Sequence, residues 1–339
     1  MAYSRTVREF DPHPLLRNPH AMTIAAAFWP RRNPGLNHAA DRLFEVEPGS
    51  RLLARCHWQA QPQRHPTLVL IHGLEGSSES GYMLGTAVKA FRRGFNVVRM
   101  NQRNCGGTEK LTPTLYNSGL SGDVRAVVTE LLERDRLPEV FAAGFSMGGN
   151  LVLKMAGEFG DKAPAGLRGV AAVCPSIDLA ACADAVGERR NFIYEWHFVA
   201  NLKQRMRRKA RLFPDRYPLD GINRVRSVRE FDDVITARFC GFRDADDYYA
   251  RSSARRVLAA IHIPTLILTA QDDPMVPYAP FLDPALQSNP NIAVIASRHG
   301  GHCAFLARDS GEERFWAEAR IVEFCQQQSQ RMASSCESI

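Results

Sequence analysis

The sequence predicts an α/β fold: an eight-stranded, mostly parallel sheet with helices on both faces and an inserted helical cap. Short apolar or β-branched runs alternate with amphipathic stretches of helical length, which is typical of a parallel sheet covered by helices. A run of about 90 residues separates two expected strands, far more than one crossover helix needs. The 339 residues, 45% of them hydrophobic, supply enough apolar side chains for one core with an elaboration.

Eight strands are expected in chain order. The first two, 43–49 and 52–58, are separated by a Pro-Gly-Ser turn and should pair as an antiparallel hairpin. The other six should form the parallel part of the sheet: 67–73, 95–101, 140–146, 169–175, 265–271 and 292–298. The apolar periodicity predicts the main helices near 81–93, 119–136, 148–159 and 311–327.

These elements divide the chain into regions. Residues 1–40 form an N-terminal extension, and 41–174 together with 262–327 form the sheet domain. The helical cap is expected over 175–261, inserted between two strands. The tail 328–339 is rich in Gln and Ser and is expected to fray.

One cap helix, 198–213, concentrates the charge of the chain. Its apolar residues recur at helical spacing: Phe198, Leu202, Met206, Ala210 and Phe213. It also carries six basic residues and no acidic one, which leaves 7 − 6 = +1 for the rest of the chain. A charge so confined, without interleaved aromatics, argues against a nucleic-acid partner. A solvated helix face is the ordinary explanation, and contact with anionic lipid is the alternative.

The cellular compartment and the absence of a metal site are predicted from features that the sequence lacks. No apolar run is long enough for a bilayer span or a secretory signal, which predicts a cytoplasmic protein. The eight cysteines are scattered, with no CxxC pair, so we expect reduced thiols, no zinc site and no disulfide framework. No metal or other cofactor is predicted.

The segment GFSMG, residues 144–148, has the pattern of a nucleophile elbow, with a strand before it and a helix after it. Such a turn strains the backbone of Ser146, and it needs small neighbours two residues away, here Gly144 and Gly148. The turn would lift the Ser146 hydroxyl clear of the sheet and direct the helix N-terminus toward the reaction centre. The sequence therefore predicts Ser146 as a nucleophile.

A serine nucleophile needs a base and an acid that orients the base. In hydrolases with this elbow, both follow the serine in the order acid, then histidine. A late strand ends in Asp272 and Asp273, of which we favour Asp273, and the last strand is followed by His299 and His302, of which we favour His302. Asp178, after an earlier strand, is a third possible acid.

An oxyanion hole needs two backbone N–H donors near the serine. One is expected from Met147, which follows the nucleophile at the start of the helix. The other is expected from Leu74, in the glycine-rich loop 72–78 after the third strand. A phosphate-binding loop is excluded there, because the lysine and the spacing of that motif are missing.

Several motifs together resemble the α/β-hydrolase superfamily, and specifically its YheT-like branch. They are HGLEGSS, NQRNCGG, GFSMGGN, the DDP turn, GGHCAF and the N-terminal NPHAMTI, in which Met22 replaces the usual Gln. The branch includes bacterial predicted esterases and eukaryotic lipid esterases, phospholipases and monoacylglycerol lipases. The resemblance implies Ser146 as nucleophile, Asp273 as acid and His302 as base. The H-x-x-x-x-D acyltransferase motif of some relatives is absent from the sequence.

The leading functional hypothesis is a serine carboxylic-ester hydrolase, with a small-molecule acyl ester as its substrate. Since the base must be neutral to act, the rate is expected to fall below about pH 6.5. An acyltransferase using the same triad is the first alternative, and a non-catalytic binding protein with this fold is the second. The sequence predicts neither the acyl chain length nor the oligomeric state.

Overall fold

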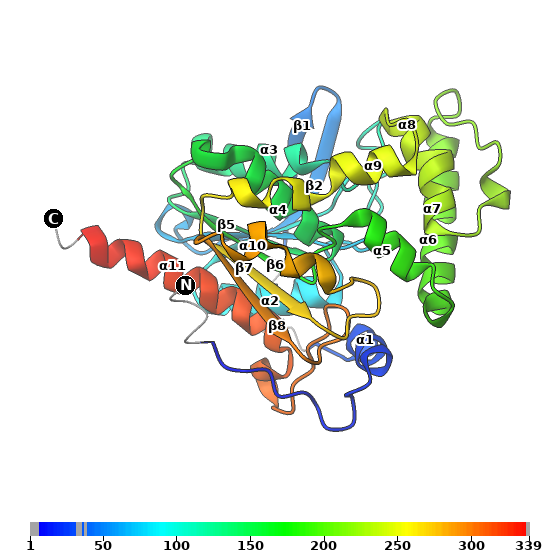
Figure 1. Ribbon diagram of the computed structural model, residues 1–339. Coiled ribbons are helices and arrows are strands. Elements are labelled where there is room, and N and C mark those ends of the chain that lie inside the picture. The colour runs from blue at the N-terminus through cyan, green and yellow to red at the C-terminus, as the bar shows by residue number, and fades with distance from the viewer. Residues whose placement is uncertain (1–6, 32–35, 37–38, 337–339) are drawn as a thin grey trace.

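A computed structural model describes residues 7–31, 36 and 39–336. Its centre is one eight-stranded sheet in the order β1-β2-β4-β3-β5-β6-β7-β8, which confirms the predicted architecture. Figure 1 shows the sheet between layers of helices, with the cap to one side. The strands are β1 (Ala40–Glu47), β2 (Ser50–His57), β3 (Thr67–Ile71), β4 (Asn96–Met100), β5 (Val140–Phe145), β6 (Leu167–Val173), β7 (Thr265–Ala270) and β8 (Ile292–Ser297).

The first two strands form the predicted antiparallel hairpin. Glu47 pairs with Ser50, so only Pro48 and Gly49 form the loop. Gly49 has a φ of +76°, which a residue without a side chain adopts most easily. Strand β2 then pairs antiparallel with β4, and every later pairing is parallel. All carboxyl ends of the parallel strands therefore open toward one edge of the sheet, where α/β proteins place their sites.

Helices cover both faces of the sheet. On one face, α3 (Ser121–Glu133) and α4 (Met147–Phe159) pack against alternate residues of the central strands. On the other, α2 (Gly81–Arg92) and α11 (Trp316–Cys336) pack against the intervening residues. The five parallel strands from β3 to β7 are buried on both faces, which explains why their sequences are continuous apolar runs rather than alternating ones.

The segment between β6 and β7 holds a group of helices that packs over the strand ends. They are α5 (Leu179–Val186), α6 (Phe192–Leu212), α7 (Val228–Phe231), a π-helical turn (Asp232–Ala237), α8 (Arg238–Cys240) and α9 (Ala245–Ser252). Helix α6 begins six residues before the predicted helix 198–213, and it has its own apolar cluster with Tyr217 and Phe231. We call residues 175–261 the cap.

The C-terminal helix continues beyond its predicted end. A frayed tail was expected over 328–339, but α11 runs to Cys336, and residues 337–339 lie outside the described part of the chain. Gln328 is buried, and the Ser329 hydroxyl donates to Glu139, so the helix still packs on the sheet domain at these two residues. A polar composition did not reveal those contacts. Among the described residues, no helix is long and apolar enough to cross a bilayer.

Two shorter helices complete the fold. Helix α10 (Pro284–Gln287) lies between β7 and β8, and α1 (Pro19–Phe28) lies in the N-terminal extension. Helix α1 begins with Asn18 as its N-cap, whose side chain accepts a hydrogen bond from the Ala21 N–H. It packs through its own apolar cluster against the loop that follows β8.

Candidate active site

Ser146 occupies a strained turn between β5 and α4. Its φ of +53° and ψ of −118° are unusual for a residue with a side chain. A Cβ added to Gly144 would lie 2.1 Å from the Gly148 carbonyl oxygen, and one added to Gly148 would lie 2.4 Å from the Ile71 carbonyl oxygen. No larger side chain fits at either position. The turn therefore has the steric form predicted from the GFSMG pattern.

The fold brings Asp273 and His302 together. The His302 ring nitrogen Nδ1 lies 2.8 Å from Asp273 Oδ2 and 3.2 Å from Oδ1. The Asp273 side chain is fully buried, and its Oδ1 also accepts hydrogen bonds from the N–H groups of Met275 and Val276. These bonds fix the carboxylate, and the carboxylate fixes the ring with Nε2 pointing away from it. His302 and Ser146 line the same two cavities.

The rival side chains lie elsewhere. Asp272 Oδ2 lies 3.3 Å from His299 Nδ1, and Asp272 Oδ1 accepts a hydrogen bond from the Gly301 N–H. Asp272 and His299 therefore form a separate pair, and neither residue lines any of the four cavities described for residues 7–31, 36 and 39–336. Asp178 is the N-cap of α5 and forms an ion pair with Arg255 at 3.0 Å. Geometry therefore separates Asp273 and His302 from each alternative.

The pKa of His302 is raised well above its ordinary value. Burial alone would lower it, but the negative charge of Asp273, the neighbouring Cys303 and the hydrogen bond to Asp273 outweigh that effect. Cys303 shifts the other way: burial opposes its ionisation, yet the Cys174 thiol and the charge of His302 lower the pKa of Cys303. The imidazole is thus held in a site that favours its protonated form.

The loop after β3 lies beside the serine. A Cβ added to Gly73 would lie 3.2 Å from the Ser146 Cβ, and the Gly73 N–H donates to the Tyr82 hydroxyl at 3.1 Å. Leu74 follows and lines both cavities with Ser146. Met147 is the first residue of α4, where a backbone N–H has no acceptor within the helix. Leu74 and Met147, the residues predicted to supply the oxyanion donors, thus both lie near Ser146.

The N-terminal motif NPHAMTI supports the histidine, a role that the sequence did not predict. The Thr23 hydroxyl accepts the His302 backbone N–H at 2.9 Å and donates to the Pro19 carbonyl at 2.7 Å. Met22 is fully buried and packs in an apolar cluster with Ala304, which explains how an apolar residue serves at this position. The motif's place in the sequence, far from the other site residues, gave no sign of this contact.

Two cavities meet at Ser146 and His302. One, of about 840 Å³, lies beneath the cap, and Leu74, Phe198 and Leu202 contribute to its mainly apolar wall. The other, of about 1080 Å³, lies between α1 and the loop 73–82. An extended molecule with its reacting carbon at Ser146 therefore has space on both sides.

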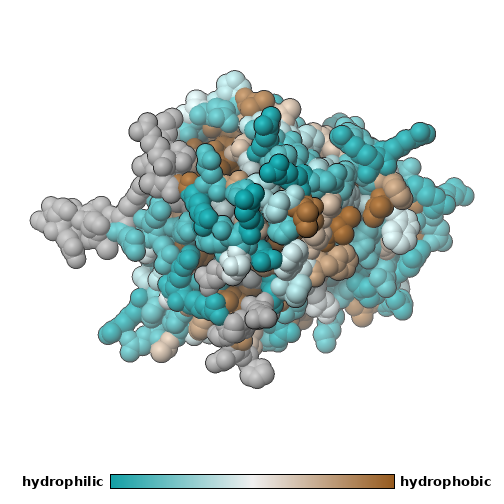
Figure 2. All heavy atoms as spheres, turned by 90° about the horizontal axis from the view of Figure 1, so that it is seen from below, coloured by the Kyte–Doolittle hydropathy of each residue, from teal (hydrophilic) through white to brown (hydrophobic). Residues whose placement is uncertain are grey.

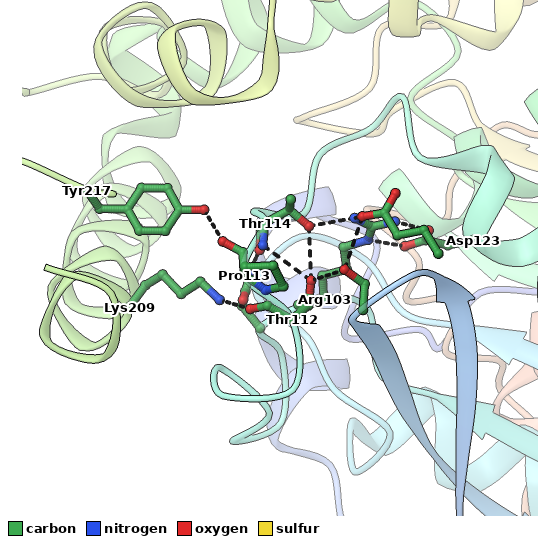
Figure 3. A network of polar contacts seen from close by, with 10 residues as sticks. Arg103, Thr112, Pro113, Thr114, Asp123, Lys209 and Tyr217 are labelled. Carbon is green, nitrogen blue, oxygen red and sulfur yellow. Dashed lines mark hydrogen bonds and ion pairs between the residues drawn. The ribbon is translucent and has the colours of Figure 1, made fainter. Parts of the chain in front are cut away.

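Buried cations of α6 attach the cap to the loop 101–117. Figure 3 shows Lys209 and Tyr217 of the cap reaching Thr112 and Pro113 of this loop. Lys209 is fully buried and donates to the Glu109 carbonyl at 2.7 Å and to the Thr112 carbonyl. On the opposite side of the loop, Arg103 forms a two-pronged ion pair with Asp123 of α3. The loop is thus held between the cap and the sheet domain.

Arg205 connects α6 to the loop that carries Leu74. Its guanidinium lies 3.1 Å from Glu75 Oε2, and Glu75 Oε1 accepts the Tyr116 hydroxyl at 2.6 Å. Both charged side chains are nearly buried, and Glu75 has a φ of +58°. Of the six basic residues in 198–213, Arg205, Arg208 and Lys209 bond to the sheet domain, whereas Lys203, Arg207 and Arg211 bond within the cap.

Large apolar side chains are exposed at the start of α6 and the end of α1. They are Phe192, Ile193, Trp196 and Phe28. The two helices are joined by the stacked rings of His20 and Tyr194, 5.7 Å apart. The face drawn in Figure 2 is mostly hydrophilic, with hydrophobic residues gathered over part of it.

Comparison with known proteins agrees with this architecture. Residues 66–309 match the family model described as alpha/beta hydrolase fold. The chain belongs to this family. It is 33% identical to the protein named "Putative esterase YheT" of Escherichia coli over 267 residues, 78% of each chain. It is 31% identical to mouse phospholipase ABHD3 over 242 residues, 71% of this chain and 58% of that protein.

A yeast relative carries the name medium-chain fatty acid ethyl ester synthase/esterase 2. The identity is 28% over 323 residues, 87% of this chain and 67% of that protein. These relatives confirm the YheT-like resemblance predicted from the motifs and the prediction of an esterase- or lipase-type hydrolase. Among solved structures, the Pyrococcus furiosus esterase Pf2001 superposes with a TM-score of 0.58 at 15% identity, covering 88% of this chain and 98% of that one. At that identity the similarity shows the fold alone.

Proposed function

We propose that this hydrolase is a serine carboxylic-ester hydrolase that acts on acyl esters through an acyl-enzyme. The observation that carries the proposal is the buried Asp273–His302 pair, which shares a cavity with a serine in a strained turn. This combination matches the roles of acid, base and nucleophile. The names of the relatives support ester substrates, but the triad is inferred here from geometry.

The proposed reaction begins with attack of the Ser146 oxygen on the substrate carbonyl carbon. His302 Nε2 accepts the serine proton, while Asp273 holds the other ring nitrogen and stabilises the imidazolium. The N–H groups of Leu74 and Met147 stabilise the tetrahedral oxyanion. The C–O bond then breaks, His302 protonates the departing alcohol, and water, activated by His302, releases the carboxylic acid in a second round. No other group is needed for these steps.

The cavity beneath the cap is proposed to receive the acyl chain. Its wall combines Phe198 and Leu202 of α6 with Leu179, Val186 and Met275, so a hydrocarbon chain would be transferred from water to apolar contacts. The second cavity, beside α1, would then receive the alcohol part or water. This division predicts that hydrolysis depends on acyl chain length. A role in lipid metabolism is consistent with such a cavity.

Covalent labelling tests the proposal. A fluorophosphonate probe should modify the intact protein once, on the peptide that contains Ser146, and Ser146→Ala should abolish both labelling and ester hydrolysis. Ser176→Ala is the matched control, because Ser176 lines the same cavity but is not in the strained turn; this variant should still be labelled. Undiminished hydrolysis by folded Ser146→Ala protein would overturn the proposal.

Transfer of the acyl group to an alcohol is a second candidate, favoured by the synthase/esterase name of the yeast relative. The same acyl-enzyme would react with an alcohol in place of water. Product analysis in water with ethanol separates the two: free acid supports hydrolysis, and ethyl ester supports transfer. Membrane contact through 198–213 and a cytoplasmic location stay predictions from the sequence.

A further inference from the structure

Two thiols lie beside the histidine of the proposed triad. The Sγ atoms of Cys174 and Cys303 and a ring nitrogen of His302 all lie within 4.8 Å of one another. Cys303 Sγ is 3.9 Å from His302 Nε2. Cys174 directly follows β6, and Cys303 lies in the loop after β8. The scattered cysteines predicted no zinc site, but the fold brings together two that are 129 residues apart.

The spacing of the three atoms suits a soft divalent metal ion. Tetrahedral zinc binds sulfur near 2.3 Å and nitrogen near 2.0 Å, so its ligand atoms lie roughly 3.5–4 Å apart. Cys303 Sγ and His302 Nε2 already lie 3.9 Å apart, and all three ligand atoms lie within 4.8 Å of one another. Small shifts of the side chains would bring the three atoms to the spacing of a tetrahedral site. Two thiolates and one imidazole leave a fourth position for water. Thiolate and imidazole ligands favour Zn²⁺ and similar ions over Mg²⁺ or Ca²⁺.

Neighbouring groups orient these ligands as in known zinc sites. The Asp273 carboxylate holds His302 Nδ1, which leaves Nε2 on the side of the ring that faces Cys303 Sγ. This carboxylate–histidine arrangement is the usual support of a zinc-bound imidazole. The Cys303 backbone N–H lies 3.3 Å from Cys174 Sγ, a hydrogen bond that stabilises a thiolate. Both supports are part of the fold itself.

An ion can reach the cluster from the cavity beside α1. Cys303 and His302 line this cavity together with Ser146, and it provides about 1080 Å³ of open space. Cys174 is fully buried and lies behind them. A cation entering the cavity would therefore meet Cys303 and His302 first, and Cys174 would complete the set.

We propose that a thiophilic divalent cation such as Zn²⁺ or Cd²⁺ binds to Cys174, Cys303 and His302 and switches the enzyme off. On binding, the thiols and the protonated His302 imidazole release their protons to water, and the two thiolates balance the charge of the ion. The Nε2 lone pair then binds the metal and can no longer accept the Ser146 proton. Binding itself does not depend on the proposed function, whereas its inhibitory effect does.

Binding is tested on the full chain, kept reduced. Equilibrium dialysis with Zn²⁺ should show one ion per chain at this site, and Cd²⁺ should produce a thiolate-to-metal absorption band in the ultraviolet. Cys303→Ser removes one of the two thiolate ligands, so it should weaken binding by at least about 10-fold and reduce the band. Cys182→Ser is the matched control, since Cys182 lines the other cavity outside the cluster. Unchanged binding and absorption in folded Cys303→Ser protein would overturn the site.

Inhibition is measured separately. Zn²⁺ should stop hydrolysis of a short-chain ester and slow fluorophosphonate labelling, and EDTA should restore both. Each variant is compared with its own metal-free rate, and Cys303→Ser should need at least about 10-fold more Zn²⁺ for half-inhibition. An ion that binds at the cluster while hydrolysis continues would overturn the switch. Metal binding without any ester hydrolysis would instead contradict the proposed function and leave the metal site intact.

Discussion

The floor and the roof of the cavity at Ser146 are held by different interactions. The floor consists of strand-end loops, where steric limits and backbone hydrogen bonds fix Ser146 and Asp273. The roof is the cap, which buried cations of α6 attach to carbonyl and carboxylate oxygens of the sheet domain. Rigid short loops suit the chemistry, because reacting groups tolerate little displacement.

Substitutions in the floor and in the roof should therefore have different effects on activity and stability. A change in the floor should alter the chemical step on every ester. A change in the roof should alter stability, or the response to acyl chain length, more than the chemistry. Arg205 lies between these cases, because it belongs to the cap but bonds to the loop that carries Leu74.

Asp273→Asn should give the largest effect. The asparagine fills the same space but removes the charge that raises the pKa of His302, so kcat should fall by about 1,000- to 10,000-fold. In the wild-type enzyme, His302 becomes protonated and inactive as a base when the pH falls below its raised pKa. The rate should therefore start to fall at a pH above 6.5, the value expected from an ordinary histidine.

The pH profile of the residual activity checks the cause. In Asp273→Asn the acid limb should move to lower pH, because the carboxylate no longer favours the imidazolium. Asp272→Asn is the matched control, since Asp272 pairs with His299 instead; its acid limb should stay in place. If the acid limb of the Asp273→Asn profile stays at the wild-type pH, Asp273 does not act through His302.

Arg205→Met should lower kcat by about 10- to 100-fold through the loop that carries Leu74. The variant leaves the nearly buried Glu75 without its cation, so the loop is expected to shift and misplace one oxyanion donor. Arg207→Met is the control, because Arg207 is exposed on the same helix and bonds within the cap. If Arg205 acts through Glu75, the double variant with Glu75→Gln should lose less than the product of the single losses. A purely multiplicative loss would contradict the coupling.

How much the sequence predicts differs between floor and roof for a physical reason. The elbow, the two strand-end loops and the eight strands follow from local rules: small residues around a tight turn, apolar runs, and polar residues where strands end. Only contacts distant in sequence distinguish Asp272 and Asp178 from Asp273. The contact from Thr23 to His302 spans 279 residues, and no local pattern indicates it.

The roof was harder to predict because charge alone does not reveal what a side chain contacts. Six basic residues on one helix suggested a solvated or lipid-facing surface, yet Lys209 is buried and donates to two carbonyls. Backbone acceptors carry no sequence signature, so a lysine that binds them resembles any other lysine. The thiol cluster was missed for a similar reason, since ligand spacing along the chain says nothing about loops that meet in space.

Lys209→Ala should destabilise the protein and impair long-chain esters more than short ones. It leaves two buried carbonyls without a donor, at a cost of about 1–3 kcal/mol each. Lys203→Ala is the matched control, because Lys203 donates to carbonyls within the cap. The measurement is the midpoint of denaturant unfolding, together with hydrolysis rates for a series of acyl chain lengths. Equal losses in the two variants would contradict a cap attached through Lys209.

The pH dependence of stability sharpens this test. Burial and the nearby Arg216 lower the pKa of Lys209 to about 8 from 10.5. Between these values the unfolded chain binds a proton that the folded chain has released, so this residue makes the folded state more stable as pH rises. Lys209→Ala has no such titrating group. The difference in the free energy of unfolding between wild type and this variant should therefore grow from pH 8 to 10. A constant difference would show that Lys209 does not titrate in this range.

Replacing the outward charges of the roof should have the smallest effect. Arg207→Gln with Arg211→Gln removes two exposed cations that bond only within the cap, so hydrolysis and stability should stay close to wild type. Flotation with anionic and neutral vesicles is the informative measurement. Binding to anionic vesicles that the double variant loses would support lipid contact through 198–213. If wild type binds neither vesicle, these charges are a solvated face, and the basic character of α6 lies in its contacts with the sheet domain.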